Sequence, residues 1–204
     1  MQQRDAFLEV IFKKACQERD IILMSADFGA PMIDKFKETV PDQFIHCGIS
    51  EQNMVNVAVG LALAGKRPYL YAMSPFFLRC FEQLKLAAFH QVPITVISVG
   101  AGLSYAGSGP THYATEDIAC YRTLVGARLY TASTCNLAAA IAKETLSLKK
   151  MTIVRLERGE TPELYPFETS LQDGYSFHYD SNSAPYVTCG YLVHYLKSRG
   201  HPVV

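Results

Sequence analysis

The chain has 204 residues, which is enough for one α/β domain with a sizeable core and a further segment. Hydrophobic residues make up 49% and charged residues 19%, a balance that excludes a disordered chain. Lys+Arg and Asp+Glu both number 19, so the net charge is zero and gives no electrostatic basis for binding nucleic acid or a membrane surface.

No apolar run approaches the roughly 20 residues of a transmembrane helix, and the first residues lack the layout of a signal peptide. The six cysteines show no C-x-x-C spacing, and most of them lie within apolar patterns. We therefore expect free thiols and a cytoplasmic location.

Short apolar runs alternate with helical patterns through most of the chain. In chain order we expect a helix over residues 5–19, a strand over 21–24, a short helix ending near residue 39, a strand over 44–47, a helix over 51–64, a strand over 69–72, a helix over 76–90, a strand over 94–99, a helix over 115–124, a strand over 128–131, a helix over 135–147 and a strand over 152–156. Gly65 is placed to end the third of these helices as a C-terminal cap. The alternation predicts an α/β fold, a mostly parallel sheet of about six strands with helices on both faces.

The composition changes after residue 160 to a polar, turn-rich stretch containing Pro162 and Pro166. A helical pattern over 191–198 follows, and residues 200–204 could start a strand. We therefore expect one domain over residues 1–160, and a linker with the beginning of another unit over 161–204.

Residues 48–54, Gly-Ile-Ser-Glu-Gln-Asn-Met, follow a predicted strand and open a predicted helix. Ser50 stands in an N-cap position, and Glu51 lies in the first turn, where the helix dipole stabilises an anion. Alone, such a glutamate is an ordinary charge at a helix start. Ligands of parallel sheets gather at the carboxyl ends of the strands, and Glu51 lies at such an end.

This run resembles the G-I-x-E-Q-N-M motif in the pyrimidine-binding domain of transketolase-like thiamine diphosphate enzymes. Residues 60–68, 74–85 and 100–119 resemble further stretches of that domain, in the same order. The resemblance implies that Glu51 contacts the cofactor and is catalytic, because a carboxylate beside the aminopyrimidine favours its imino tautomer.

The resemblance also implies further cofactor and catalytic residues. Phe76 matches the aromatic residue that stacks on the aminopyrimidine, Phe77 is the nearby alternative, and Met73 takes the place of a second ring. His112, after a Gly-Pro-Thr run, would face the substrate and relay protons. Without the motif, the phenylalanines would be ordinary core residues and His112 a solvated loop residue.

Three residues are implied to face the substrate, namely Asp27, Ser108 and Arg158. Asp27 matches an aspartate near the substrate pocket, although an aspartate there is also a common capping residue. Arg158 aligns with an arginine that contacts sugar phosphate. The chain departs from the family pattern where Ser108 replaces an aspartate, Gly100 a histidine and Pro31 a serine. These departures favour an unphosphorylated or modified sugar over ordinary ketose phosphates.

The chain lacks the Gly-Asp-Gly motif with which these enzymes bind the diphosphate and its Mg²⁺. We expect it to supply the pyrimidine half of a thiamine diphosphate site and no metal ligand. A diphosphate-binding transketolase N-terminal subunit, or a missing N-terminal segment, would supply the other half and the Mg²⁺ in a homo- or hetero-oligomer. Residues 161–204 resemble a linker and the truncated start of a transketolase C-terminal domain.

Three interpretations remain open. The joint presence of Glu51, Phe76 and His112 favours the pyrimidine-binding part of a two-component transketolase-like enzyme, which transfers a two-carbon ketol unit between sugars and is inactive alone. The second is a non-catalytic scaffold or binding subunit that keeps the fold. The replacement of the usual aspartate by Ser108 slightly favours this second interpretation. The third is another thiamine diphosphate enzyme, such as a deoxyxylulose phosphate synthase or the β subunit of a 2-oxo acid dehydrogenase. Residues 101–105 resemble transketolase C-terminal subunits more than either.

Overall fold

The computed structural model describes residues 1–26, 29–163, 188–200 and 203. Six strands form one sheet in the order β2-β1-β3-β4-β6-β5, and every neighbouring pair is parallel. The strands are β1 (Ile21–Ser25), β2 (Phe44–His46), β3 (Arg67–Met73), β4 (Thr95–Val99), β5 (Arg128–Thr131) and β6 (Thr152–Leu156). The parallel sheet of about six strands that the sequence predicts is confirmed.

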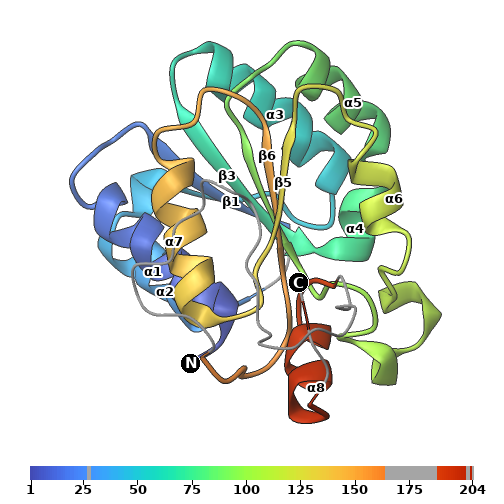
Figure 1. The fold of residues 1–204 in the computed structure, drawn as a ribbon. Helices are drawn as coiled ribbons and strands as arrows, with labels where there is room; N and C mark the ends of the chain where they lie inside the picture. Colours follow the sequence, from blue (N-terminus) through green and yellow to red (C-terminus); the bar gives the residue numbers. More distant parts are fainter. Residues whose placement is uncertain (27–28, 164–187, 201–202, 204) are drawn as a thin grey trace.

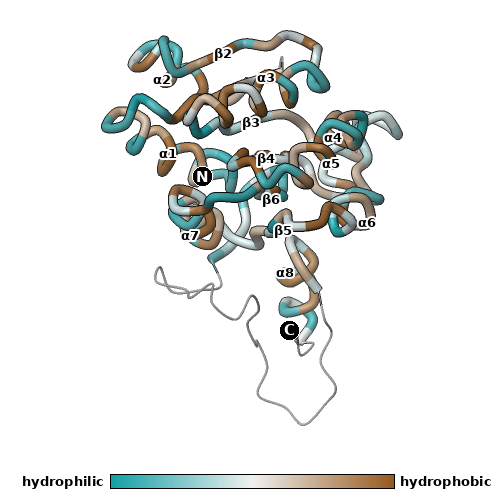
Figure 2. Tube along the Cα trace, turned by 90° about the horizontal axis from the view of Figure 1, so that it is seen from above, coloured by the Kyte–Doolittle hydropathy of each residue, from teal (hydrophilic) through white to brown (hydrophobic). Residues whose placement is uncertain are grey.

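Helices cover both faces of the sheet (Figure 1). One face carries α1 (Gln3–Ala15), α2 (Pro31–Thr39) and α7 (Cys135–Thr145). The other carries α3 (Glu51–Leu63), α4 (Ser74–Leu78), α5 (Phe81–Phe89) and α6 (Asp117–Tyr121). Figure 2, turned by 90°, shows the same two groups on opposite sides of the sheet.

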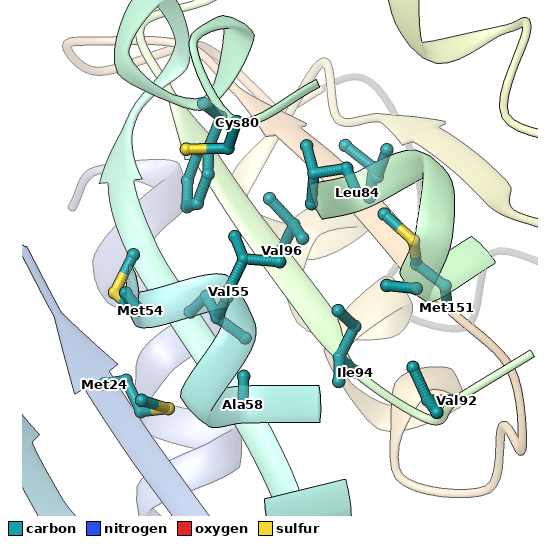
Figure 3. Close-up of a cluster of buried hydrophobic side chains, with 14 of the residues drawn as sticks. Met24, Met54, Val55, Ala58, Cys80, Leu84, Val92, Ile94, Val96 and Met151 are labelled. Atoms are coloured by element: carbon teal, nitrogen blue, oxygen red, sulfur yellow. The ribbon is translucent and has the colours of Figure 1, made fainter. Parts of the chain in front are cut away.

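The two faces of the sheet build two separate cores. Along β1, Ile22 and Met24 pack towards α3 and α5, whereas Ile21 and Leu23 pack towards α1 and α2. This alternation follows from the two-residue period of a strand, and it needs apolar side chains on both faces because both are covered. Figure 3 shows part of the first core, in which Val55 of α3 and Leu84 of α5 lie on either side of Val96, and Met54, Ala58 and Cys80 belong to the same cluster.

The predicted helix over residues 76–90 is two helices in the structure, α4 and α5, so this prediction is wrong. The chain turns at Arg79 and Cys80, and Cys80 leaves helical geometry with φ −97° and ψ 16°. The turn buries both Phe77 and Cys80 completely while leaving Arg79 exposed. The other predicted helices form, with ends that differ by a few residues.

Gly65, at φ +83°, caps α3 as expected, and Lys66 N–H donates to the Leu61 carbonyl at 2.9 Å.

The chain beyond β6 is described in part. The predicted helix over 191–198 is α8 (Leu192–Ser198), which lies near the carboxyl ends of β5 and β6 (Figure 1). His194 Nε2 is 2.6 Å from the Ser133 carbonyl oxygen, and Tyr191 N–H donates to Glu157 Oε1 at 3.4 Å. Most of the predicted linker lies outside the described residues, and so does most of the strand predicted to start after residue 200. The domain boundary at residue 160 stays a prediction. None of the helices in the described part of the chain combines the length and the apolar character needed to span a membrane.

The amino end of the sheet is held by Arg67 at the start of β3. Its guanidinium donates from Nε to Asp20 Oδ2 at 2.7 Å, from Nη1 to the Leu146 carbonyl at 3.0 Å, and from Nη2 to the Glu18 carboxylate. These contacts tie the segments that follow α1 and α7 to the start of the sheet. The Arg67 hydrogen bond holds the pKa of Asp20 below its ordinary value.

The lowered pKa of Asp20 predicts a pH dependence of stability. Because the folded-state pKa is depressed, the pair stabilises the fold above the ordinary pKa of aspartate, and this stability is lost as the pH falls through the folded-state value. Urea unfolding followed by circular dichroism between about pH 7 and about pH 3 should show a smaller loss of stability for Asp20→Asn than for the wild type. Asp42→Asn, at an exposed carboxylate, should lose stability as the wild type does. Equal slopes for Asp20→Asn and the wild type would contradict this account.

Candidate functional site

Glu51 is the first residue of α3 and lies at the carboxyl end of β2. The turn into the helix uses Gly48 at φ +67°, and Ser50 N–H donates to the Gly48 carbonyl at 2.8 Å. Ser50 occupies the N-cap position, but its hydroxyl donates to the Cys47 carbonyl at 2.6 Å and makes no capping bond to the helix. This arrangement places a glutamate residue that is only 7% exposed at the edge of the sheet where ligands of this fold class bind.

A guanidinium group connects Glu51 to an aromatic ring. Arg79 Nη2 is 3.5 Å from Glu51 Oε1, and the centre of the same guanidinium lies 4.8 Å from the centroid of the Phe76 ring. The Phe76 ring in turn meets the His112 ring edge-on, with centroids 5.8 Å apart and an interplanar angle of 66°. The structure therefore brings Glu51, Phe76 and His112 into one connected group, although their three segments are far apart in the sequence.

The other two residues predicted to contact the cofactor, Met73 and Phe77, are less accessible to solvent than Phe76. Met73, the last residue of β3, is 5% exposed, and Phe77 is fully buried in the core shared by α3 and α5. Phe76 is only partly buried, so its ring remains available to a ligand. This difference favours Phe76 over Phe77 as the stacking residue.

A buried hydrogen-bond network lies at the start of α4. The Ser74 and Ser98 hydroxyls are 2.7 Å apart, and the Tyr121 hydroxyl is 3.3 Å from that of Ser98. Burial raises the pKa of Tyr121 far above its ordinary value, so its hydroxyl stays protonated. The network joins the first turn of α4 to β4 and α6. Sequence reasoning missed it, although a serine inside the apolar run of β4 is a usable signal for such a network.

Cys80 lies next to Arg79 and close enough to Glu51 to respond to its charge. Burial, and then the negative charge of Glu51, raise the pKa of Cys80 to about 12. Cys80 is therefore a neutral thiol at physiological pH and no candidate nucleophile.

The loop after β4 carries His112 and is built around Tyr105. A Cβ on Gly100, at φ +86°, would lie 2.5 Å from the Tyr105 ring, so only glycine fits there. A histidine at residue 100, where the family pattern has one, would strain the backbone and require the Tyr105 ring to move. Thr111 Oγ1 lies 3.0 Å from His112 Nδ1, within hydrogen-bond distance. With Nδ1 engaged in this way, Nε2 is the ring nitrogen that could face a ligand.

A buried ion pair anchors the end of the same loop. Arg155 Nε donates to Asp117 Oδ2 at 2.8 Å, and its Nη1 donates to Thr131 Oγ1 at 2.9 Å. Both charged side chains are almost fully buried. The pair fixes the start of α6 to β5 and β6, and thereby the position from which the loop returns.

Of the residues predicted to face the substrate, Ser108 lies in this loop before His112, and Arg158 follows β6. Ser108 is exposed in a short 3₁₀ turn, Ala106–Ser108. Arg158 is also exposed, and its guanidinium lies 4.6 Å from the Tyr105 ring centroid. Asp27 lies outside the described residues. The structure does not bring Ser108 or Arg158 into contact with Glu51, so their assignment to the substrate stays a prediction.

The chemistry of this group fits the aminopyrimidine half of thiamine diphosphate. It offers a nearly buried carboxylate beside a partly exposed aromatic ring, which are the two things that an aminopyrimidine needs. Within the part of the chain that the structure describes, no three His, Cys, Asp or Glu side chains come together as metal ligands would.

Comparison with known proteins agrees with this geometry. Residues 1–163 match the family described as transketolase, pyrimidine binding domain. The chain is 29% identical over 165 residues to one of the subunits of an apulose-4-phosphate transketolase from Phocaeicola vulgatus, a match that covers 79% of this chain and 53% of that protein. It is 30% identical over 181 residues to transketolase-like protein 1 of Mus musculus, covering 87% of this chain and 30% of that protein. The chain thus spans about half and about a third, respectively, of these two relatives.

A solved structure described as "Split gene transketolase, inactive beta4 tetramer" superposes on the whole chain. The TM-score is 0.83 at 22% sequence identity, and the match covers 70% of that protein. At this identity the likeness shows the shared fold.

The difference in burial between the Phe76 and Phe77 rings predicts a difference in the stability that each ring contributes. Phe77→Ala should lower the free energy of unfolding by about 3–5 kcal/mol, because it leaves a cavity in the core. Phe76→Ala should lower it by less than about 1.5 kcal/mol, because the ring is partly exposed already. The protein has no tryptophan, so urea unfolding should be followed by far-ultraviolet circular dichroism. A larger loss for Phe76→Ala than for Phe77→Ala would reverse the two roles.

Proposed function

The chain belongs to the transketolase pyrimidine-binding domain family, and we propose on that premise that it is the pyrimidine-binding part of a two-component transketolase. The complete enzyme would transfer a two-carbon ketol unit between sugars, and this chain would be inactive without a diphosphate-binding subunit. The observation that carries the proposal is the nearly buried Glu51 carboxylate at the start of α3, joined through Arg79 to the partly exposed Phe76 ring.

Membership of the family implies the use of thiamine diphosphate. When bound, this cofactor supplies a nucleophilic carbon that can form and break bonds next to a carbonyl group. The Glu51 carboxylate would share a proton with a ring nitrogen of the aminopyrimidine, an exchange that a nearly buried site strengthens. Phe76 would provide the face on which that ring stacks, with Met73 at the base.

His112 is the proposed proton relay on the substrate side. Its Nδ1 is engaged by Thr111, so Nε2 would exchange a proton with a carbonyl or hydroxyl oxygen of the sugar. Its edge-on contact with Phe76 would keep this nitrogen close to the cofactor ring. Arg158 and Ser108 would contact the sugar further out, and Asp27 is proposed for the same pocket.

The family description and the names of two similar proteins support the need for a second polypeptide. The family match describes a pyrimidine-binding domain only, one relative is named as a single subunit of a transketolase, and one structural neighbour is described as a split gene product in a tetramer. We infer that a transketolase N-terminal subunit provides the groups for the diphosphate and for Mg²⁺, and that the assembled enzyme is an oligomer. The proposed setting is carbohydrate metabolism in the cytoplasm.

The sugar is proposed to differ from the ordinary pentose phosphates. Ser108 stands where the family pattern has an aspartate, and the Tyr105 ring occupies the place that a side chain at residue 100 would take. The P. vulgatus relative is named for apulose-4-phosphate, a different sugar phosphate. These observations support a modified sugar as substrate.

The proposal is tested by the complex of this chain with the diphosphate-binding polypeptide of its own source, assayed for ketol transfer with thiamine diphosphate and Mg²⁺. Glu51→Gln should lower kcat at least about a hundredfold, because the carboxylate would act as a general acid/base. Glu82→Gln, at an exposed position of α5, should leave kcat unchanged. Turnover of Glu51→Gln within about threefold of the wild type would contradict the role of Glu51. A stable but inactive wild-type complex would favour a scaffold instead.

A further inference from the structure

The backbone of Arg79 is held by a hydrogen bond, whereas its side chain is largely exposed. Its carbonyl accepts a hydrogen bond from Gln52 Nε2 at 3.0 Å, which ties the turn between α4 and α5 to the first turn of α3. Its side chain is 59% exposed. The guanidinium can therefore rotate towards solvent without any change in the backbone on which it stands.

Within the described part of the chain, the guanidinium contacts two side chains, and both belong to residues proposed to hold the pyrimidine. It lies 3.5 Å from Glu51 Oε1 and 4.8 Å from the Phe76 ring centroid. A guanidinium is planar, stacks on aromatic faces and donates N–H groups to carboxylates. It thereby compensates part of the cost of holding the Glu51 carboxylate, whose side chain is only 8% exposed, away from water.

An aminopyrimidine ring bound here would contact the same two side chains, Glu51 and Phe76. It is planar, it would stack on Phe76, and it would hydrogen-bond to Glu51. Because one guanidinium already contacts both this carboxylate and this ring, an aminopyrimidine that made the same two contacts would compete with it.

We propose that Arg79 is a further residue of the pyrimidine site, which closes the site in the chain alone and must leave both Glu51 and Phe76 before an aminopyrimidine can enter. This inference rests on the proposed function. Both contacts are of a kind that is easily lost, since the ion pair is long and the arginine is largely exposed to water. Arg79 is thus a displaceable cover rather than a permanent support.

Thiamine is the appropriate probe, because it carries the aminopyrimidine and lacks the diphosphate that the second polypeptide would bind. Its dissociation constant for the full chain can be measured by ligand-observed NMR up to millimolar concentrations. Arg79→Ala should bind thiamine about tenfold more tightly than the wild type, because no cation has to be displaced. Arg79→Lys keeps the charge but loses the flat stacking group, and should fall between the two.

Lys85→Ala is the matched control, because it removes one exposed positive charge from α5 outside the site and should bind thiamine as the wild type does. Equal or weaker binding by Arg79→Ala would overturn the inference. The absence of thiamine binding by Arg79→Ala at millimolar concentration would also overturn it, because no site would be there to uncover. Neither result bears on the role of Glu51 in the assembled enzyme, which the kcat of Glu51→Gln tests separately.

Discussion

All six strands of the sheet run in the same direction, and the placement of the site follows from that constraint. Each strand delivers the segment after it to one common edge. Glu51 after β2, Phe76 after β3 and His112 after β4 therefore meet at this edge, although none of them is close to another in the sequence. The parallel sheet requires helices over both faces, and α3 and α4 present two of these residues.

Buried polar contacts turn this common edge into a defined group. The Ser74–Ser98–Tyr121 network fixes the first turn of α4, and the Arg155–Asp117 pair fixes the end of the loop that carries His112. Removing one partner of such a contact leaves the other buried without compensation, so the contacts enforce one geometry. Glu51 lacks comparable support, since the arginine that pairs with it, Arg79, is exposed. The Glu51 carboxylate is thus held by one long ion pair to an exposed side chain, which suits a residue that awaits a ligand.

The fold was predictable from the sequence because its signals are local. Runs such as Thr95–Val99 are apolar and β-branched, and helical periodicities of about ten residues separate them. The single helix over residues 76–90 was predicted wrongly because the apolar spacing continues through Arg79 and Cys80. The break depends on the burial of Phe77 and Cys80 in a core built by distant segments, which no local pattern encodes. The same holds for the contact between Glu51 and Arg79 and for the pair of Asp117 and Arg155. The proposed roles of Glu51, Phe76 and His112 rest on motif resemblance, and the structure adds the proximity of these residues.

The central claim is that this chain holds one half of a thiamine diphosphate site. Equilibrium dialysis with thiamine diphosphate and Mg²⁺ tests it directly, on this chain alone, on the diphosphate-binding polypeptide of its own source alone, and on their mixture. We expect the mixture to retain about one cofactor for each copy of this chain at micromolar cofactor, and this chain alone to retain almost none. Stoichiometric retention of cofactor and Mg²⁺ by this chain alone, or no gain on mixing, would contradict the claim.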